Sequence, residues 1–185
     1  STHSHGKPIR LLILLGSGGH TAEMLRLLQH LASSSHRDLY APSQYLITAG
    51  DRMSEGRVRR FDSQPSTLPS RLYPIPRARK VKQSWLTTPF TTAWSFVASI
   101  RILWCLSFDV FLCNGPGTCV PLALLIFIPK FFGFSTPPII YVESFARVKS
   151  LSLSGKLLYP IVDLFLVQWP DLVQRWPKAQ YHGVL

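Results

Sequence analysis

Residues 11–25 read LLILLGSGGHTAEML, and this stretch decides the fold. The five apolar residues 11–15 have the length of a strand and no polar alternation, which is typical of a strand buried on both faces of a parallel sheet. Glycines and one serine fill positions 16–19, and apolar residues then recur at helical spacing from Met24 onward. The stretch predicts a strand, a glycine-rich turn and a helix in direct succession.

The same alternation continues to the end of the chain. Strands are predicted at Ile9–Leu15, Gln44–Ala49, Leu72–Ile75, Asp109–Cys113, 138–144 and 163–168, with a last short strand or tail at 181–185. Helices are predicted after the first turn up to 33–35, at Ser54–Phe61, from about 88, after 121, at Leu151–Tyr159 and, as a turn or helix, at Asp171–Trp176. This order indicates an α/β fold, a Rossmann-like doubly wound parallel sheet. We expect residues 1–8 to be disordered and 9–185 to form one domain.

The composition points to an anionic partner and to a covered apolar surface. The chain is 46% hydrophobic, yet it has no uninterrupted apolar run of membrane-spanning length, so a membrane interface or a protein partner is expected. Its net charge is +11, and nine of the 20 lysines and arginines fall between Arg52 and Lys82. This cluster favours phosphate, nucleic acid or an acidic membrane surface, unless it is simply a solvated basic loop.

Metal and disulfide chemistry find little support in the sequence. The three cysteines, Cys105, Cys113 and Cys119, lack CxxC spacing and are odd in number, which argues against a zinc site and a disulfide framework. Paired carboxylates of the DxD kind are absent from the sequence. We therefore predict no metal site and no cofactor.

Two glycine-rich turns suggest a phosphate or diphosphate site. A helix that begins near Gly19 leaves its first backbone N–H groups unpaired, and glycine lets an anion approach them closely. The turn is neither a P-loop nor a full dinucleotide fingerprint, because Thr21 stands where the third glycine would be. A second turn, NGPGT at 114–118, also follows a strand, and parallel strands end at one edge of the sheet, so both turns can line one crevice. Turn geometry alone is the competing interpretation.

Two titratable residues stand at strand ends. His20, at the start of the first helix, can accept a proton beside an anion. Glu143 follows the apolar run PIIYV and can act as a base, accept a hydrogen bond from a substrate hydroxyl, or serve only as a cap or ion-pair partner. Arg147 and Lys149 lie close enough in sequence to keep this carboxylate ionised.

Five motifs together resemble one known family. They are GSGGHT (16–21), IPRARKVKQSW (75–85), LCNGPGTCVP (112–121), YVES (141–144) and VQWP (167–170). The chain resembles the membrane-recruiting subunits of the eukaryotic UDP-N-acetylglucosamine transferase that acts in dolichol-linked oligosaccharide synthesis. This family is related to the N-terminal domain of the bacterial MurG-type transferases.

The resemblance implies the N-terminal, acceptor-side half of a GT-B glycosyltransferase. A separate donor-binding catalytic subunit would complete a heterodimer, which would transfer GlcNAc with inversion from UDP-GlcNAc to dolichyl-diphosphate-GlcNAc. It implies the cytosolic face of the endoplasmic reticulum membrane, no nucleic-acid partner and an enzyme inactive without its partner. The family normally begins with a transmembrane helix, so we expect such an anchor upstream of Ser1.

The resemblance also implies roles for individual residues. His20 and Glu143 would be catalytic, and either is a candidate base, with His20 preferred and Glu143 orienting the sugar. The acceptor and its diphosphate would be bound by Gly16, Ser17, Gly18, Gly19, Thr21, Asn114, Gly115, Gly117 and Thr118. Membrane or anion contacts would come from Arg77, Arg79, Lys80, Lys82 and Trp85, and partner contacts from Gly183, Val184 and Leu185.

Three other functions compete with this interpretation. A stand-alone Rossmann-like module would bind a nucleotide without a partner, and Asp38 lies near the distance at which a ribose-binding carboxylate is expected. A basic nucleic-acid-binding protein would explain the charge but not the glycine turns. A non-catalytic membrane scaffold would need neither His20 nor Glu143.

Overall fold

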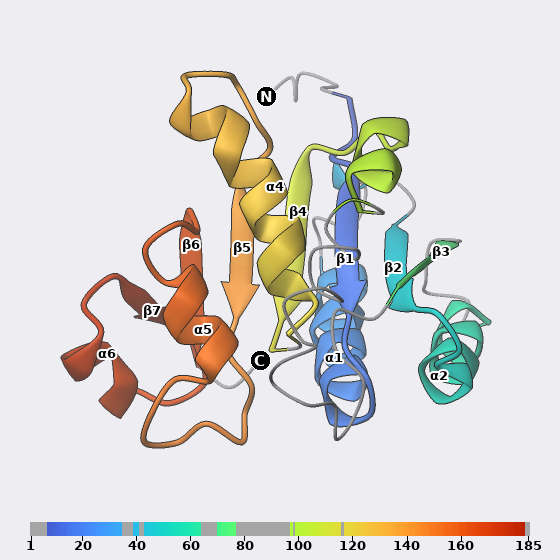
Figure 1. Cartoon of the computed structure of the whole chain (residues 1–185). Helices are drawn as coiled ribbons and strands as arrows, with labels where there is room; N and C mark the ends of the chain where they lie inside the picture. The colour runs from blue at the N-terminus through green and yellow to red at the C-terminus, as the bar shows by residue number, and fades with distance from the viewer. Residues whose placement is uncertain are drawn as a thin grey trace, which may run out of the picture.

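The computed structural model describes residues 7–34, 39–40, 43–63, 70–76, 97, 99–115 and 117–183. Seven parallel strands form one sheet in the order β3-β2-β1-β4-β5-β6-β7 (Figure 1). The strands are β1 Leu11–Leu15, β2 Gln44–Thr48, β3 Arg71–Ile75, β4 Val110–Asn114, β5 Ile139–Val142, β6 Leu164–Val167 and β7 Ala179–Tyr181. The helices are α1 Gly19–Ser33, α2 Arg52–Asp62, α4 Cys119–Phe131, α5 Leu153–Leu158 and α6 Asp171–Arg175, and residues 99–105 are also helical. The predicted doubly wound parallel sheet is confirmed.

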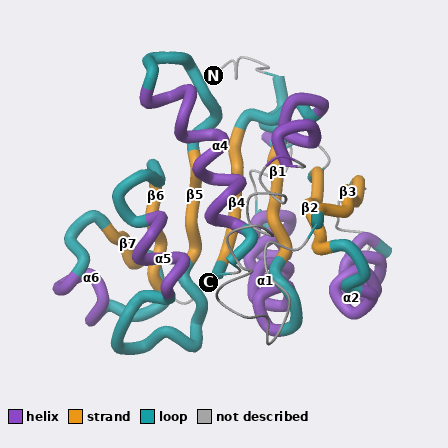
Figure 2. The backbone as a smooth tube through the Cα atoms, in the orientation of Figure 1, coloured by secondary structure: helices purple, strands orange, loops and turns teal. Residues whose placement is uncertain are grey.

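Both faces of the sheet are covered by helices (Figure 2). Leu12 and Leu14 of β1 belong to a core cluster that includes residues of α4, α5 and α6. Ile13, between them, belongs to a second cluster with residues of α1 and α2. Because successive side chains of a strand point to opposite faces, β1 must be apolar at every position, and all five of its residues are buried.

The winding of the chain reverses between β1 and β4. From β1 the chain adds β2 and β3 on one side, and then returns to add β4 to β7 on the other. Leu14 of β1 is in register with Cys113 of β4, so the turns after these two strands leave the sheet side by side. In an open α/β sheet this point, at the carboxyl ends of the strands, is where ligands bind.

Most predicted elements are found within a few residues of their predicted bounds. Differences occur at strand ends: β1 begins at Leu11, since the backbone N–H of Arg10 donates to Asp109 Oδ2, and Asn114 is the last residue of β4. The predicted last strand is β7, which begins at Ala179, before the predicted 181–185. Residues 1–6, the basic loop at 77–85 and the start of the aromatic helix lie outside the described residues. Cys113 and Cys119 are buried, whereas Cys105 is exposed.

Candidate active site

The first glycine turn is closed by buried hydroxyl groups. The carbonyl oxygen of Gly16 accepts a hydrogen bond from Thr21 Oγ1, and Ser54 Oγ of α2 lies 2.8 Å from Thr21 Oγ1. Both side chains are fully buried. The sequence resemblance assigns Thr21 to the acceptor site, but the structure shows its hydroxyl fixing the turn, with no exposed surface to offer a ligand.

The same turn opens α1 at a glycine. Gly18 is the N-cap residue, with φ of 64° and ψ of −116°, and among the described residues no side-chain cap bond is made there. A positive φ of this kind favours glycine. Arg57 of α2 donates from Nη1 to the Gly18 carbonyl, which brings a guanidinium group to the turn. Unpaired helix N–H groups beside an arginine favour an anionic ligand.

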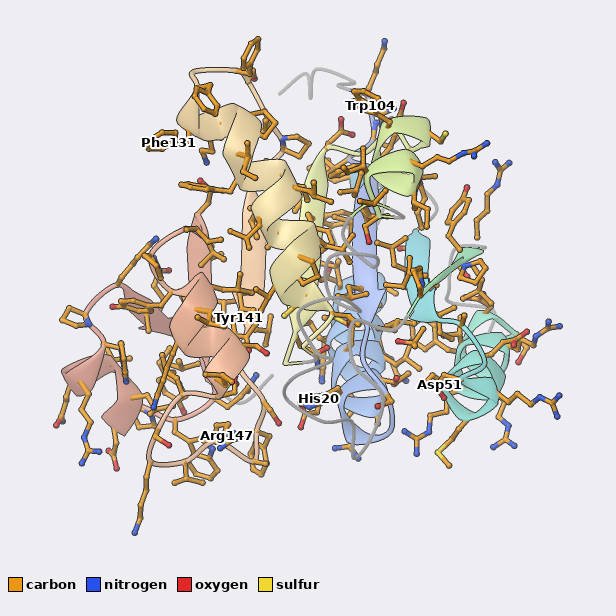
Figure 3. All side chains as sticks on the ribbon, in the orientation of Figure 1. His20, Asp51, Trp104, Phe131, Tyr141 and Arg147 are labelled. Atoms are coloured by element: carbon orange, nitrogen blue, oxygen red, sulfur yellow. The ribbon has the colours of Figure 1, made fainter. Side chains whose placement is uncertain are left out.

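The second glycine turn lies against the first. Asn114, at the end of β4, donates from Nδ2 to the carbonyl oxygen of His20 at 2.9 Å. Gly115 has φ of 55°, and a Cβ atom there would lie 2.4 Å from Cε1 of the His20 ring. The two turns, far apart in the sequence, therefore lie against each other where the strand order predicts a crevice. Figure 3 shows His20 toward the same lower edge of the molecule as Asp51 and Arg147.

Three polar atoms at this crevice lack hydrogen-bond partners within the described part of the chain. They are Nδ1 of His20, Oδ1 of Asn114 and Oγ1 of Thr118, and each atom is buried. Asn114 as a whole is 1% exposed, and Thr118 precedes α4 without capping it. Buried polar atoms in proteins nearly always have partners, so an unpaired group at two helix starts indicates a ligand or an ordered water.

Glu143 lies elsewhere in the carboxyl edge of the sheet and is 1% exposed. Its carboxylate accepts hydrogen bonds from the backbone N–H groups of Ser144 and Ser152, at 3.1 and 2.9 Å. Ser152 Oγ and Tyr141 Oη complete the shell at 3.1 and 3.5 Å. Arg147 and Lys149, which the sequence suggested as its charge partners, are exposed. Burial, with Glu143 close by, raises the pKa of Tyr141.

Strand alternation explains why Glu143 does not meet α1. Tyr141 belongs to the core cluster on the α4 and α5 side, and Glu143, two residues later, is bonded on that side as well. Val142 belongs to the opposite cluster, and Ser144, two residues later, lies on the same side as Val142. There, Ser144 Oγ donates to Glu23 Oε1 of α1 at 2.9 Å. Sequence reasoning missed Glu23 and Ser144, although Glu23 stands three residues after His20, a spacing that places two side chains on one helix face.

Beside the two turns lies a small pocket. Glu23 and Met24 of α1, Asn114 of β4, Val142 of β5 and Phe145 are among the residues that line it. It offers a carboxylate, an amide and apolar surface within reach of the glycine turns. Its lining therefore combines a few polar groups with an apolar wall.

Several predicted contacts are not described by the structure. Arg77, Arg79, Lys80, Lys82, Trp85, Val184 and Leu185 lie outside the described residues. Gly183 is described, with φ of 94°, just after β7. The described residues contain no helix long and apolar enough to span a bilayer and no group of three or more side chains suited to a metal ion.

The sequence of this chain is similar to those of known proteins. A family model described as "Oligosaccharide biosynthesis protein Alg14 like" matches residues 11–185. The UDP-N-acetylglucosamine transferase subunit alg14 of Schizosaccharomyces pombe is 49% identical over 187 residues, covering 98% of this chain and 87% of that protein. The human subunit ALG14 is 41% identical over 182 residues, covering 95% and 82%.

Among solved structures, MurG of Acinetobacter baumannii has the same fold. It superposes with a TM-score of 0.62 at 16% sequence identity. The match covers 89% of this chain but only 42% of MurG, so the chain corresponds to less than half of that protein. The predicted fold class, a Rossmann-like sheet of the GT-B glycosyltransferase type, is confirmed.

Proposed function

This chain belongs to the Alg14-like family of oligosaccharide biosynthesis proteins, as its motifs indicated, and from that premise we propose that it is the acceptor-binding subunit of a UDP-N-acetylglucosamine transferase. The proposed acceptor is dolichyl-diphosphate-GlcNAc, and the product is the lipid-linked chitobiose of N-glycan assembly. The observation that carries the proposal is the meeting of two glycine turns at the point where the winding of the sheet reverses.

The crevice between the turns suits a sugar diphosphate. No side-chain cap bond is made at the start of α1 among the residues that the structure describes, and Arg57 brings a positive charge to Gly18. Asn114 Oδ1 and Thr118 Oγ1 are buried and unpaired within the described residues, so they are available to a bound hydroxyl or to water. Helix N-termini with glycine turns stabilise phosphate groups through backbone N–H groups and the helix dipole.

His20 is the proposed general base. It would take the proton from the 4-hydroxyl of the acceptor GlcNAc as that oxygen attacks the anomeric carbon of the donor. The bond between this carbon and the diphosphate oxygen of UDP breaks at the same time, UDP leaves, and the configuration at the carbon is inverted. A well-placed base contributes about 10²–10⁴-fold to such a step. Glu143 is engaged by Ser144, Ser152 and Tyr141, so its proposed part is to support the loop beside the crevice.

The donor would be bound mainly by a separate subunit. The relatives of this chain are named as subunits of a transferase, which supports a heterodimer. The chain matches less than half of MurG, which leaves room for a second domain supplied by the partner. The enzyme would work at the cytosolic face of the endoplasmic reticulum membrane, and in this proposal the chain carries no metal or cofactor of its own.

Reconstitution tests this proposal. GlcNAc transfer from UDP-GlcNAc to a polyprenyl-diphosphate-GlcNAc acceptor is measured with this chain alone, with the donor subunit alone and with both. Turnover only with both, lost in His20→Ala, is the expected result. Full turnover by the donor subunit alone would contradict it. Full turnover of the pair when this chain carries both His20→Ala and Glu143→Gln would indicate that the chain is a non-catalytic scaffold. Tight nucleotide binding by this chain alone would favour a nucleotide-binding module.

A further inference from the structure

We propose that Glu23 is a positioning residue for His20, and that Ser144 holds Glu23 in place for this task. The inference rests on the proposed role of His20 as the base. It assigns a function to a contact between α1 and the end of β5 that no sequence motif revealed. Neither Glu23 nor Ser144 is proposed to touch the reacting atoms.

The geometry links the three side chains in one row. His20 Nδ1 lies 3.8 Å from Glu23 Oε2, on the same face of α1. The second carboxylate oxygen, Oε1, accepts a hydrogen bond from Ser144 Oγ at 2.9 Å. Ser144 is 5% exposed and is the second residue after the end of β5, next to Glu143. Glu23 is therefore oriented by the loop after β5, while its other oxygen, Oε2, lies toward the imidazole.

His20 Nδ1 needs such a partner. This nitrogen is buried and makes no hydrogen bond in the described part of the chain, although the side chain as a whole is 34% exposed. The accessible part of the ring consequently lies away from Nδ1. A distance of 3.8 Å exceeds a hydrogen bond, and it is an ion pair only when the imidazole carries the second proton; catalytic hydrogen bonds are often long before substrate binds.

The chemical consequence is a defined tautomer. If Nδ1 carries its hydrogen toward the Glu23 carboxylate, Nε2 is left without one and is the nitrogen able to accept a proton. The carboxylate also stabilises the imidazolium that forms when Nε2 accepts the proton of the acceptor hydroxyl. In this step the O–H bond of the acceptor hydroxyl breaks and an N–H bond forms at Nε2, while Glu23 stays ionised.

A purely structural role for Glu23 makes different predictions. Such a role would consist of the Ser144 contact alone, which joins α1 to the loop after β5. Glu23→Gln would keep an oxygen able to accept from Ser144, so folding would be preserved. The Gln amide can also donate to Nδ1, however, and this would reverse the tautomer of His20. Tautomer and turnover therefore separate the two roles.

The test uses the assembled enzyme. Glu23→Gln is expected to lower kcat about 10²-fold, the lower end of what a general base contributes, with acceptor KM changed less than about twofold. Ser144→Ala is expected to lower kcat less, about tenfold, because Glu23 loses only its support. The matched control is Glu55→Gln, the same substitution at a surface glutamate of α2 that pairs with Arg59; it should leave turnover unchanged.

Two further readouts decide the outcome. Nitrogen-15 NMR of the His20 ring in the complex should report hydrogen on Nδ1 in the wild type and a changed or mixed tautomer in Glu23→Gln. In a His20→Gln background, Glu23→Gln should cause no further loss of kcat, since its effect acts through His20. Wild-type kcat with an unchanged tautomer in Glu23→Gln, while His20→Gln is impaired, would overturn this inference alone. Wild-type kcat in His20→Gln would overturn the proposed base and this inference with it.

Discussion

The imidazole of His20 packs directly on the backbone of Gly115. A Cβ atom at position 115 would lie 2.4 Å from Cε1 and 2.7 Å from Nδ1 of the ring, far inside van der Waals contact. Gly115 lies in the turn after β4, and His20 lies at the start of α1, directly after the turn that follows β1; the winding reverses between these two strands. A glycine on one strand end thus sets the position of a candidate base on the neighbouring one.

Gly115→Ala should therefore disable the enzyme through His20. The added methyl group must displace the ring, and a displacement of about 1 Å in a catalytic group can cost about 10²-fold in rate. We expect kcat of the assembled enzyme to fall by about this factor while the fold survives, measured by turnover and circular dichroism.

Two glycine variants serve as controls for this change. Gly133→Ala introduces the same kind of backbone strain, with φ of 85°, but nothing lies within 4 Å of the new atom. It should lose stability of about 1 kcal/mol and keep its kcat. Gly56→Ala, within α2 and with open space, should keep its kcat and gain stability of up to about 1 kcal/mol. An equal loss of kcat in Gly115→Ala and Gly133→Ala would show that strain, and not His20, is responsible.

Arg57→Ala should weaken acceptor binding. Arg57 donates to the Gly18 carbonyl and brings its charge to the turn where the diphosphate is proposed to lie. Loss of the attraction between the Arg57 guanidinium and the proposed diphosphate, about 1.5 kcal/mol, corresponds to a rise of about tenfold in acceptor KM. Arg59→Ala is the matched control, because Arg59 pairs with Glu55 on the exposed face of the same helix. An equal change of KM in both variants would indicate a general charge effect.

The position of the site in the fold can be predicted from the sequence more accurately than the side chains that line the site. The glycine turns at 16–19 and 114–118 each follow a strand, and parallel strands end at one edge, so their meeting could be inferred without coordinates. The parts that could not be predicted depend on where a strand ends. A difference of one residue decides whether Glu143 or Ser144 faces α1, because side chains alternate between the faces of a strand.

Burial is the second property that the sequence conceals. Thr21 stands in the glycine motif, yet its hydroxyl is turned to Gly16 and Ser54 and is fully buried. Ser54 reaches it from α2, and no sequence spacing connects these two residues. Glu23 likewise acquires its significance from Ser144, a residue in a distant element. Contacts between elements require the packed structure.

Glu143→Gln should lower stability more than it changes catalysis. The carboxylate accepts from the N–H groups of Ser144 and Ser152, and an amide in its place would set one donor against another. We expect the free energy of unfolding to fall by about 1–3 kcal/mol, measured by urea denaturation. Gly155→Ala should act in the same direction, because its Cβ would lie 2.3 Å from Glu143 Oε2. Full stability with abolished turnover in Glu143→Gln would instead indicate a catalytic carboxylate.

The ion pair between Arg10 and Asp109 should make the free energy of unfolding depend on pH in the acid range. Hydrogen bonds from the Arg10 side chain lower the pKa of Asp109 to about 2, from an ordinary value near 3.8. A group with a lowered pKa in the folded state stabilises the fold above its unfolded pKa, and this contribution disappears as pH falls through the folded value. Asp109→Asn should therefore be less stable than the wild type near pH 7, and the difference should shrink between about pH 4 and pH 2 in urea titrations. A difference that is constant over this range would contradict the assignment.

The most direct test of the central claim is to locate the acceptor diphosphate by NMR. The chain is labelled with nitrogen-15, assembled with its unlabelled donor subunit and titrated with a short polyprenyl-diphosphate-GlcNAc. We expect the backbone amides of Gly19, His20, Gly115 and Gly117 to shift together and to saturate at one acceptor concentration. Arg57→Ala should move this saturation to higher concentration. Saturating shifts confined to other residues, with the amides of both glycine turns unmoved, would contradict it.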